Sequence, residues 1–247
     1  MKKFLMTYGI DLLVVLFVVG CIHKQYTTDT PQPEVTPVVT ETPSPAPIPS
    51  VSPVPAPVPH ALAWETPDKP ERKVWSYALV QYIIEQKDKF DQAADLTDFC
   101  PKYKTLSENS QAEAIAELIV AVVFNESAYS PISRMKEGTL GTDCVTNKPV
   151  YSEGLLQLSY CDKTWAPFCR FDWNADKNLD PKDPKKTILD PFINLECGVG
   201  IMANQVVKKK AIAFTSGNYW ATLRPNGKYG TVPDIKARVK KYAPFCF

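Results

Sequence analysis

Apolar residues between positions 110 and 126 recur at the spacing i, i+3, i+4, i+7 and i+8, which is typical of a helix with one face in a hydrophobic core. Ser110 and Glu113 match a capping box, so we expect the helix to begin at Ser110. Glu113 and Glu117 fall outside the apolar stripe, and we expect both on the solvent side. Glu126 keeps the spacing of the stripe and therefore continues the buried face at the end of the helix.

Three more segments carry helical signals. Residues 71–90 have apolar side chains at helical spacing. Asp190 followed by Pro191 is typical of an N-cap and a first helical turn, and Pro233 opens a last amphipathic segment. Strand signals are few and short, and residues 129–191 are rich in Pro, Asp and Asn. The pattern therefore predicts a mainly α domain with a loop-rich middle.

The first 20 residues predict a signal peptide. Lys2 and Lys3 precede the apolar run LLVVLFVV, which is too short to span a membrane and suits the apolar core of a secretory signal. The run ends in VVGC, which resembles a bacterial lipobox, so we expect Cys21 to become the lipidated first residue of the mature protein. An ordinary signal peptide or a short anchor is the alternative. By the sorting rules of enteric bacteria, Ile22 after the Cys favours the outer membrane, facing the periplasm.

Residues 21–59 are predicted to form a disordered linker. Positions 31–59 hold eleven of the 23 prolines and no aromatic residue, so this stretch cannot bury a core. Fully extended at about 3.1 Å per residue, it would reach on the order of 90 Å. Globular composition begins at His60, and we expect one domain at 60–247. A lipid-held domain on such a tether suits a partner at some distance from its membrane, and the cell wall is the expected one.

Net charge and cysteine content indicate which partners and cross-links to expect. The net charge is +1, so nucleic acid is not an expected partner. Six cysteines remain besides Cys21, and an even number in an exported domain predicts up to three disulfides with the pairing open. Zinc is a weaker alternative, because the chain has no C-x-x-C pair and its histidines, His23 and His60, precede the helical segments. Residues 172–183 have the oxygen spacing of a calcium loop but lack its Gly and final Glu, so we predict no metal and no cofactor.

The position of Glu126 suggests a chemical role. A helix C-terminus carries partial negative charge and partial burial disfavours an anion, so we expect a raised pKa for this carboxyl group. A carboxyl group that stays protonated near neutral pH is what a general acid needs. A structural glutamate at a helix end is the common alternative, so position alone does not assign catalysis.

Three motifs in chain order resemble the soluble lytic transglycosylases, which share a lysozyme-like fold with goose-type lysozymes. They are NESAYSP at 125–131, SEGLLQ at 152–157 and PFINL at 191–195. The resemblance covers roughly residues 118–219 and implies an α+β lysozyme-like domain that is mainly α. It implies that Glu126 is the catalytic acid and base, that Ser127 helps to hold it, and that Asn194 is mainly structural.

The same resemblance implies a substrate groove. The loop from Gly154 to Gln157 would line a glycan strand, while Glu153 departs from the small or basic residue that is common there. An aromatic residue near the C-terminus would contact the catalytic Glu or the sugar, and the sequence leaves Tyr219, Trp220, Tyr229 and Tyr242 open. The predicted substrate-binding residues are Ser127, Ser152, Gly154, Leu155, Gln157, Tyr219 and Trp220.

The implied reaction is cleavage of peptidoglycan between N-acetylmuramic acid and N-acetylglucosamine. In the transglycosylases one Glu acts as acid and then base, the muramic acid 6-hydroxyl attacks, and a 1,6-anhydro end results. A lysozyme-type hydrolase needs a second carboxylate. Glu137, Asp143 and Glu153 are available, although we expect all three to be surface loop acids. A non-catalytic peptidoglycan-binding lipoprotein is the alternative from a different class.

Overall fold

The computed structural model describes residues 60–247, and the predicted signal peptide, the lipidation site Cys21 and the linker lie outside the described residues. The described part is mainly α, as predicted. Its α-helices are α1 (Glu71–Glu85), α2 (Lys87–Phe90), α3 (Leu96–Phe99), α4 (Glu108–Ser127), α5 (Trp173–Asp176), α6 (Pro191–Lys209) and α7 (Val232–Tyr242). Its strands are β1 (Arg134–Lys136) and β2 (Tyr151–Glu153). Its 3-10 helices are η1 (Tyr103–Thr105), η2 (Tyr160–Thr164), η3 (Thr187–Leu189), η4 (Ala221–Leu223) and η5 (Pro244–Cys246).

Helix α4 is the central element of the core. It packs against α1 and α7, and every residue from 112 to 123 is buried. The prediction that Glu113 and Glu117 face solvent is therefore wrong, because these side chains are only 3% and 1% exposed. Chain segments pack around all faces of α4, and the stretch that precedes α1 covers Glu117, whose Oε1 accepts the N–H of Ala63 at 2.9 Å. A helix in this position is buried on all sides rather than along one stripe.

The helix ends follow the local signals, with small shifts. Asp190 caps α6 as predicted and accepts the first two free N–H groups of the helix. Helix α4 begins one turn before Ser110, because Ser107 is the N-cap and accepts the Ser110 N–H at 3.3 Å. The helix predicted over 71–90 is broken at Gln86 into α1 and α2.

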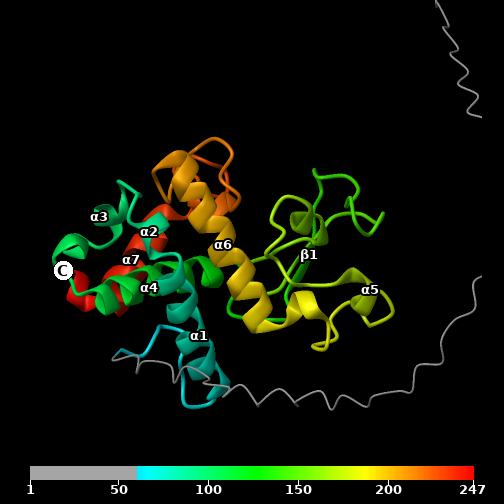
Figure 1. Cartoon of the computed structure of the whole chain (residues 1–247), viewed down its shortest axis with the longest axis horizontal. Helices are drawn as coiled ribbons and strands as arrows, with labels where there is room; N and C mark the ends of the chain where they lie inside the picture. The colour runs from blue at the N-terminus through cyan, green and yellow to red at the C-terminus, as the bar shows by residue number, and fades with distance from the viewer. Residues whose placement is uncertain (1–59) are drawn as a thin grey trace, which may run out of the picture. The chain divides into compact units, whose positions relative to one another are not determined.

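The loop-rich middle is confirmed and contains a small antiparallel hairpin of β1 and β2. Its register pairs Arg134 with Glu153 and Met135 with Ser152. Figure 1 shows this hairpin and α5 on one side of α6, with α1 to α4 and α7 on the other side. The candidate calcium loop is part of this middle region. There Asp172 caps α5, and the Asp176 carboxylate accepts the Tyr160 hydroxyl at 2.8 Å and the Thr187 N–H at 2.8 Å.

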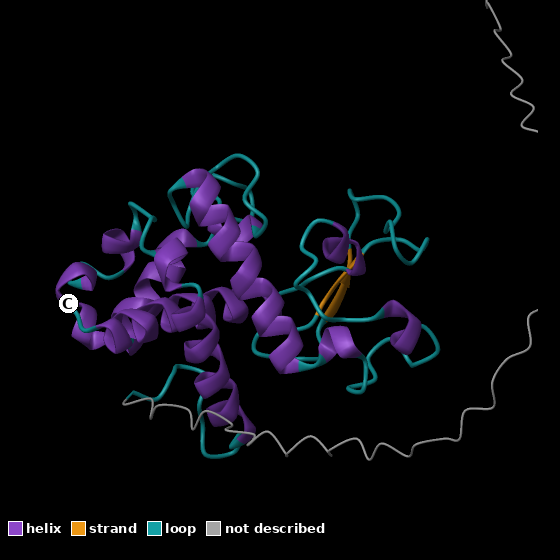
Figure 2. Cartoon of the chain, viewed as in Figure 1, coloured by secondary structure: helices purple, strands orange, loops and turns teal. Residues whose placement is uncertain are grey.

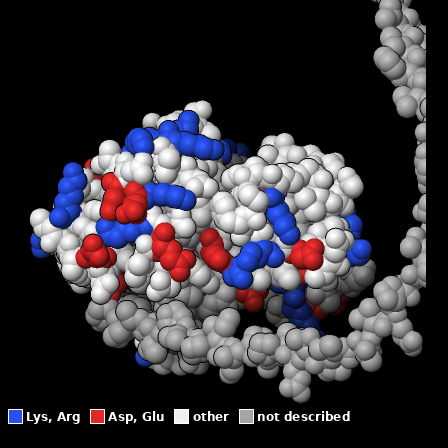
Figure 3. All heavy atoms as spheres, in the orientation of Figure 1, with Lys and Arg blue, Asp and Glu red and all other residues white. Residues whose placement is uncertain are grey.

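Three disulfides confirm the prediction from cysteine number, and they join Cys100 to Cys246, Cys144 to Cys161 and Cys169 to Cys197. The first connects the end of α3 to the C-terminus, and the other two hold the segment between η2 and α6. Within residues 60–247, no cluster of His, Cys, Asp and Glu side chains is arranged to hold a metal ion. None of the helices described there combines the length and the apolar character needed to cross a membrane. Figure 3 shows basic and acidic side chains interspersed over the visible face, in keeping with the net charge of +1.

Candidate active site

Glu126 lies in the last turn of α4, and its side chain is half-buried. The hydroxyl of Thr222, in η4, donates a hydrogen bond to Glu126 Oε1 at 2.6 Å. Burial is the main cause that raises the pKa of Glu126, and the charge of Glu137 raises it further. The Thr222 hydrogen bond and the charge of Arg224 act in the opposite direction, but the net shift is upward. The upward shift is the direction that suits a general acid.

The backbone after Glu126 ends the helix abruptly. Ala128 and Tyr129 both adopt left-handed conformations, with φ of 50° and 66°. Such conformations cost of order 1–3 kcal/mol for residues other than Gly, and surrounding contacts must hold them. Here the Tyr129 ring packs edge-on against Phe124 and Trp64. The sharp turn leaves the half-buried Glu126 carboxyl at the end of the buried stripe.

Glu137 is the second acid of the site. It follows β1, and its carboxylate accepts a hydrogen bond from the Ser152 hydroxyl on β2. The charge of Glu137 raises the pKa of both Glu126 and Tyr219. The hairpin therefore positions Glu137 and Ser152 together.

The other two candidate second acids, Asp143 and Glu153, do not belong to the site. The prediction of exposed loop acids is wrong for both, because each is only 3% exposed. Glu153 is ion-paired with the buried Lys186 and with Arg134 at 3.4 Å. Asp143 accepts three backbone N–H groups, one of them from Cys161, and so stabilises its own loop. Both carboxylates have structural partners that compensate for their burial.

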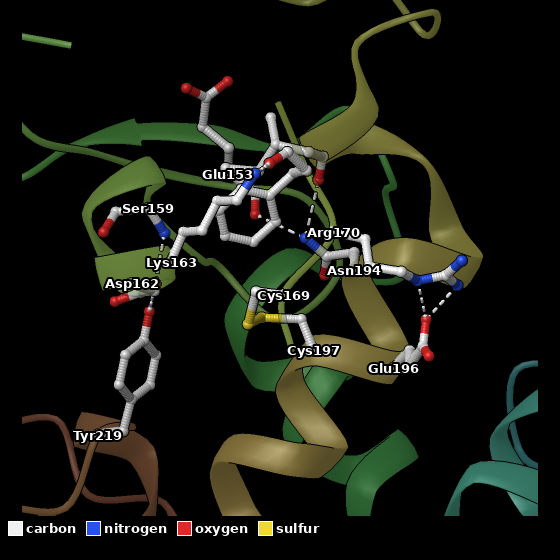
Figure 4. The surroundings of a disulfide bond; sticks show 12 residues. Glu153, Ser159, Asp162, Lys163, Cys169, Arg170, Asn194, Glu196, Cys197 and Tyr219 are labelled. Carbon is white, nitrogen blue, oxygen red and sulfur yellow. Dashed lines mark hydrogen bonds and ion pairs between the residues drawn. A yellow bond between two sulfur atoms is a disulfide. The ribbon is translucent and has the colours of Figure 1, made fainter. Parts of the chain in front are cut away.

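The loop that begins at Gly154 is held by Asn194 of α6. The Asn194 amide donates to the carbonyls of Glu153 and Ile188 at 3.1 and 2.9 Å and accepts the Leu156 N–H at 2.8 Å (Figure 4). Gly154 has φ of 82°, and a Cβ there would collide with the Asn194 amide, so only glycine fits. This arrangement matches the structural role that the resemblance implied for Asn194.

Five of the predicted substrate-binding residues are buried, namely Ser127, Gly154, Leu155, Gln157 and Trp220. Leu155 is 0% exposed, and Trp220 is 2% exposed with its Nε1–H donated to the Leu156 carbonyl at 2.9 Å. Gln157 is 6% exposed and donates to the Gly154 carbonyl at 2.7 Å. The prediction is corrected for these side chains: Leu155 is part of the core, while Gln157 and Trp220 donate to backbone carbonyls of the loop.

Ser127 also differs from the expectation. Its hydroxyl donates to the Val123 carbonyl one turn earlier at 3.0 Å, and the hydrogen bond to Glu126 comes from Thr222 instead. Sequence reasoning missed Thr222 because it lies 96 positions from Glu126. It named Glu137 as an available acid but could not separate it from the other two, since only the hairpin register places it at the site.

Tyr219 is the aromatic candidate that the structure places at the site. Its hydroxyl donates to the buried Asp162 of η2 at 2.6 Å (Figure 4). Burial and Asp162 raise the pKa of Tyr219 well above its usual value, and the charges of Glu126 and Glu137 raise it further. Tyr219 also precedes by three positions Thr222, whose hydroxyl donates to Glu126.

No family model matches the sequence, and a search of curated proteins finds no match. Solved structures of Bd0314 DslA, a Bdellovibrio protein, share the fold. The wild-type form is 25% identical with a TM-score of 0.58, and the match covers 74% of this chain and 97% of that chain. One glutamate-to-glutamine mutant of DslA is 26% identical with a TM-score of 0.52, covering 69% of this chain and 88% of that chain. A second such mutant is 24% identical with a TM-score of 0.58, covering 74% and 97%.

Proposed function

We propose that this protein cleaves the glycan strands of peptidoglycan between N-acetylmuramic acid and N-acetylglucosamine, with Glu126 as the general acid. The observation that carries the proposal is the half-buried Glu126 carboxyl, whose pKa is raised by burial and which Thr222 holds in place. The ordered resemblance of three motifs to the lytic transglycosylases supports the choice of substrate. In the full chain, the lipid on Cys21 and the linker would hold the domain within reach of the cell wall, on the periplasmic side of the outer membrane.

The first step is the same for a hydrolase and for a transglycosylase. Glu126 gives its proton to the glycosidic oxygen as the bond from that oxygen to C1 of muramic acid breaks. Positive charge develops on the sugar ring, and the newly formed Glu126 carboxylate stabilises it. A nucleophile must then attack C1, and its identity decides the product.

Glu137 supports hydrolysis. It would take a proton from the attacking water, or attack C1 itself before water releases the sugar, and both routes give a reducing end. The two DslA mutants each replace one glutamate by glutamine, and the two replaced residues lie eleven positions apart. Glu126 and Glu137 are also eleven positions apart. We therefore favour a hydrolase with two carboxylates.

A lytic transglycosylase is the second candidate, favoured by the motif resemblance. In that reaction the 6-hydroxyl of the muramic acid attacks C1 and gives its proton to the Glu126 carboxylate. The product is a 1,6-anhydro end, no water is consumed, and Glu137 is not required.

Digestion of purified sacculi, analysed by mass spectrometry, tests the proposal. The mature chain is compared with Glu126→Gln, Glu137→Gln and a control, Glu108→Gln, which changes an exposed acid in the first turn of α4. We expect wild type and the control to release fragments with reducing ends, and both site variants to be at least about 100-fold slower.

Other outcomes separate the alternatives. Anhydro ends, with full activity in Glu137→Gln, would replace the hydrolase by the transglycosylase. Sacculus binding without release by any of the four proteins would make this a non-catalytic binder. Equal activity of wild type and Glu126→Gln would refute the role of Glu126.

A further inference from the structure

Trp165 presents an exposed indole beside the candidate active site. It directly follows η2, and its side chain is 51% exposed. Its ring lies 6.1 Å from the Tyr219 ring, centroid to centroid, with a tilt of 47° between the planes. Tyr219 lies three positions before Thr222, whose hydroxyl donates to Glu126. The Trp165 and Tyr219 rings therefore form an aromatic pair next to the segment that holds Glu126.

Two disulfides fix the segment that carries Trp165. Cys161 precedes it by four residues and is bonded to Cys144, and Cys169 follows it by four residues and is bonded to Cys197 of α6 (Figure 4). The Trp165 N–H also donates to the Asp162 carbonyl at 3.1 Å. Because the cross-links already order this loop, a ligand that binds there pays less conformational entropy.

We propose that Trp165 is a sugar-binding platform, a further subsite of the glycan groove. The C–H face of a pyranose ring is apolar and packs against the face of an indole, while its hydroxyl groups stay in water. The ligand class is a long glycan strand, of which one sugar lies at Glu126 and another beyond Tyr219. This inference rests on the proposed function, since it extends the same groove.

A platform at this distance from Glu126 acts on binding rather than on the bond-breaking step. Removing a ring that stacks on a ligand typically lowers affinity by a factor of about 5 to 150. If Trp165 only positioned Tyr219, its removal would instead lower kcat and leave the dissociation constant unchanged. The two roles therefore give different readouts.

Phe168 provides a matched control in the same loop. It is aromatic and 38% exposed, but its ring lies over Gly200 of α6, in a separate groove of about 300 Å³ lined by Tyr82 and Asn204. Phe168→Ala thus removes an exposed aromatic ring from the same disulfide-bonded loop, at a position whose ring packs on α6.

The experiment measures binding and turnover of a purified peptidoglycan octasaccharide. Dissociation constants come from titration calorimetry in the Glu126→Gln background, with and without Trp165→Ala, Trp165→Phe or Phe168→Ala, and KM and kcat come from the same changes in the active chain. We expect Trp165→Ala to raise both the dissociation constant and KM at least about fivefold, with kcat changed by less than about twofold. Trp165→Phe should give values between those of Trp165→Ala and wild type. Phe168→Ala should have no effect.

An unchanged dissociation constant in both Trp165 variants overturns the inference, even if the enzyme is active. If wild type binds the octasaccharide but cleaves nothing, the proposed reaction fails, while the binding titrations still decide the role of Trp165. Weaker binding in Phe168→Ala as well would assign the effect to the loop as a whole and would also overturn the inference.

Discussion

Replacing Glu117 by glutamine is expected to stabilise the protein at alkaline pH. This glutamate lies at the centre of α4 and is 1% exposed. Its Oε1 accepts the Ala63 N–H at 2.9 Å and lies 3.4 Å from His60 Nε2. Burial raises the pKa of Glu117 to about 8, the Ala63 N–H lowers it slightly, and the charge of Glu65 raises it. Tyr129 is the other titratable group whose pKa responds to Glu117.

The sign of the effect follows from proton linkage. In the unfolded chain the pKa of Glu117 is near 4.5, so between pH 4.5 and pH 8 the folded state binds more protons. Stability contributed by this group is therefore complete below pH 4.5 and is lost as the pH rises to 8. At about 1.36 kcal/mol for each pH unit, the loss has an upper bound of about 5 kcal/mol, and we expect a few kcal/mol after water and side chains relax. Glutamine cannot ionise, and its carbonyl still accepts the Ala63 N–H.

Urea unfolding followed by tryptophan fluorescence at pH 5, 7 and 9 provides the assay. Wild type and Glu117→Gln should have similar free energies of unfolding at pH 5, and the variant should be more stable by a few kcal/mol at pH 9. Glu108→Gln, an exposed change in the same helix, should follow the wild-type curve. If the curves of wild type and Glu117→Gln stay parallel from pH 5 to pH 9, the buried glutamate is not protonated in the folded state and the reasoning is refuted.

Three further predictions concern the site and its support. Thr222→Val removes the hydrogen bond that lowers the pKa of Glu126, so the alkaline limb of kcat/KM for octasaccharide cleavage should move to higher pH; a move to lower pH would contradict the role of Thr222. Asn194→Ala removes three buried hydrogen bonds and should lower the free energy of unfolding by about 3–5 kcal/mol in urea, whereas a loss below about 1 kcal/mol would show that the loop is held by other contacts. Replacing Cys100 and Cys246 by serine removes a disulfide between residues 146 positions apart and should lower the free energy of unfolding by about 3–5 kcal/mol. The reduced wild-type chain is the comparison, and an unchanged denaturation midpoint would contradict this prediction.

Local sequence signals were sufficient for most of the helical architecture. The Asp190 cap is confirmed because its side chain accepts N–H groups only two and three residues away. The start of α4 at Ser107 was missed because Ser110 offers a comparable capping signal. The break at Gln86 was missed because no side-chain cap marks it. The fully buried α4 was also missed, because a helical period identifies the first buried face but not the number of neighbours around the helix.

The candidate site also combines features that local sequence predicts with features that depend on distant residues. The place of Glu126 at the end of an apolar stripe is a local property of one helix, so spacing alone was enough to predict a raised pKa. The glycine requirement at position 154 was anticipated only as part of a motif, and its cause is the Asn194 amide, forty residues later in the chain.

Everything that gives Glu126 its surroundings comes from distant segments. Thr222 reaches it across 96 positions. The β1–β2 register pairs Met135 with Ser152 and brings the Ser152 hydroxyl to Glu137, whose charge raises the pKa of Glu126. The Tyr219 side chain is held by the hydrogen bond that its hydroxyl donates to Asp162. Hydrogen-bond partners and the screening of charge depend on distances in space, which helical periodicity does not encode. The local apolar pattern therefore predicts the position of Glu126, while tertiary packing determines which groups shift its pKa.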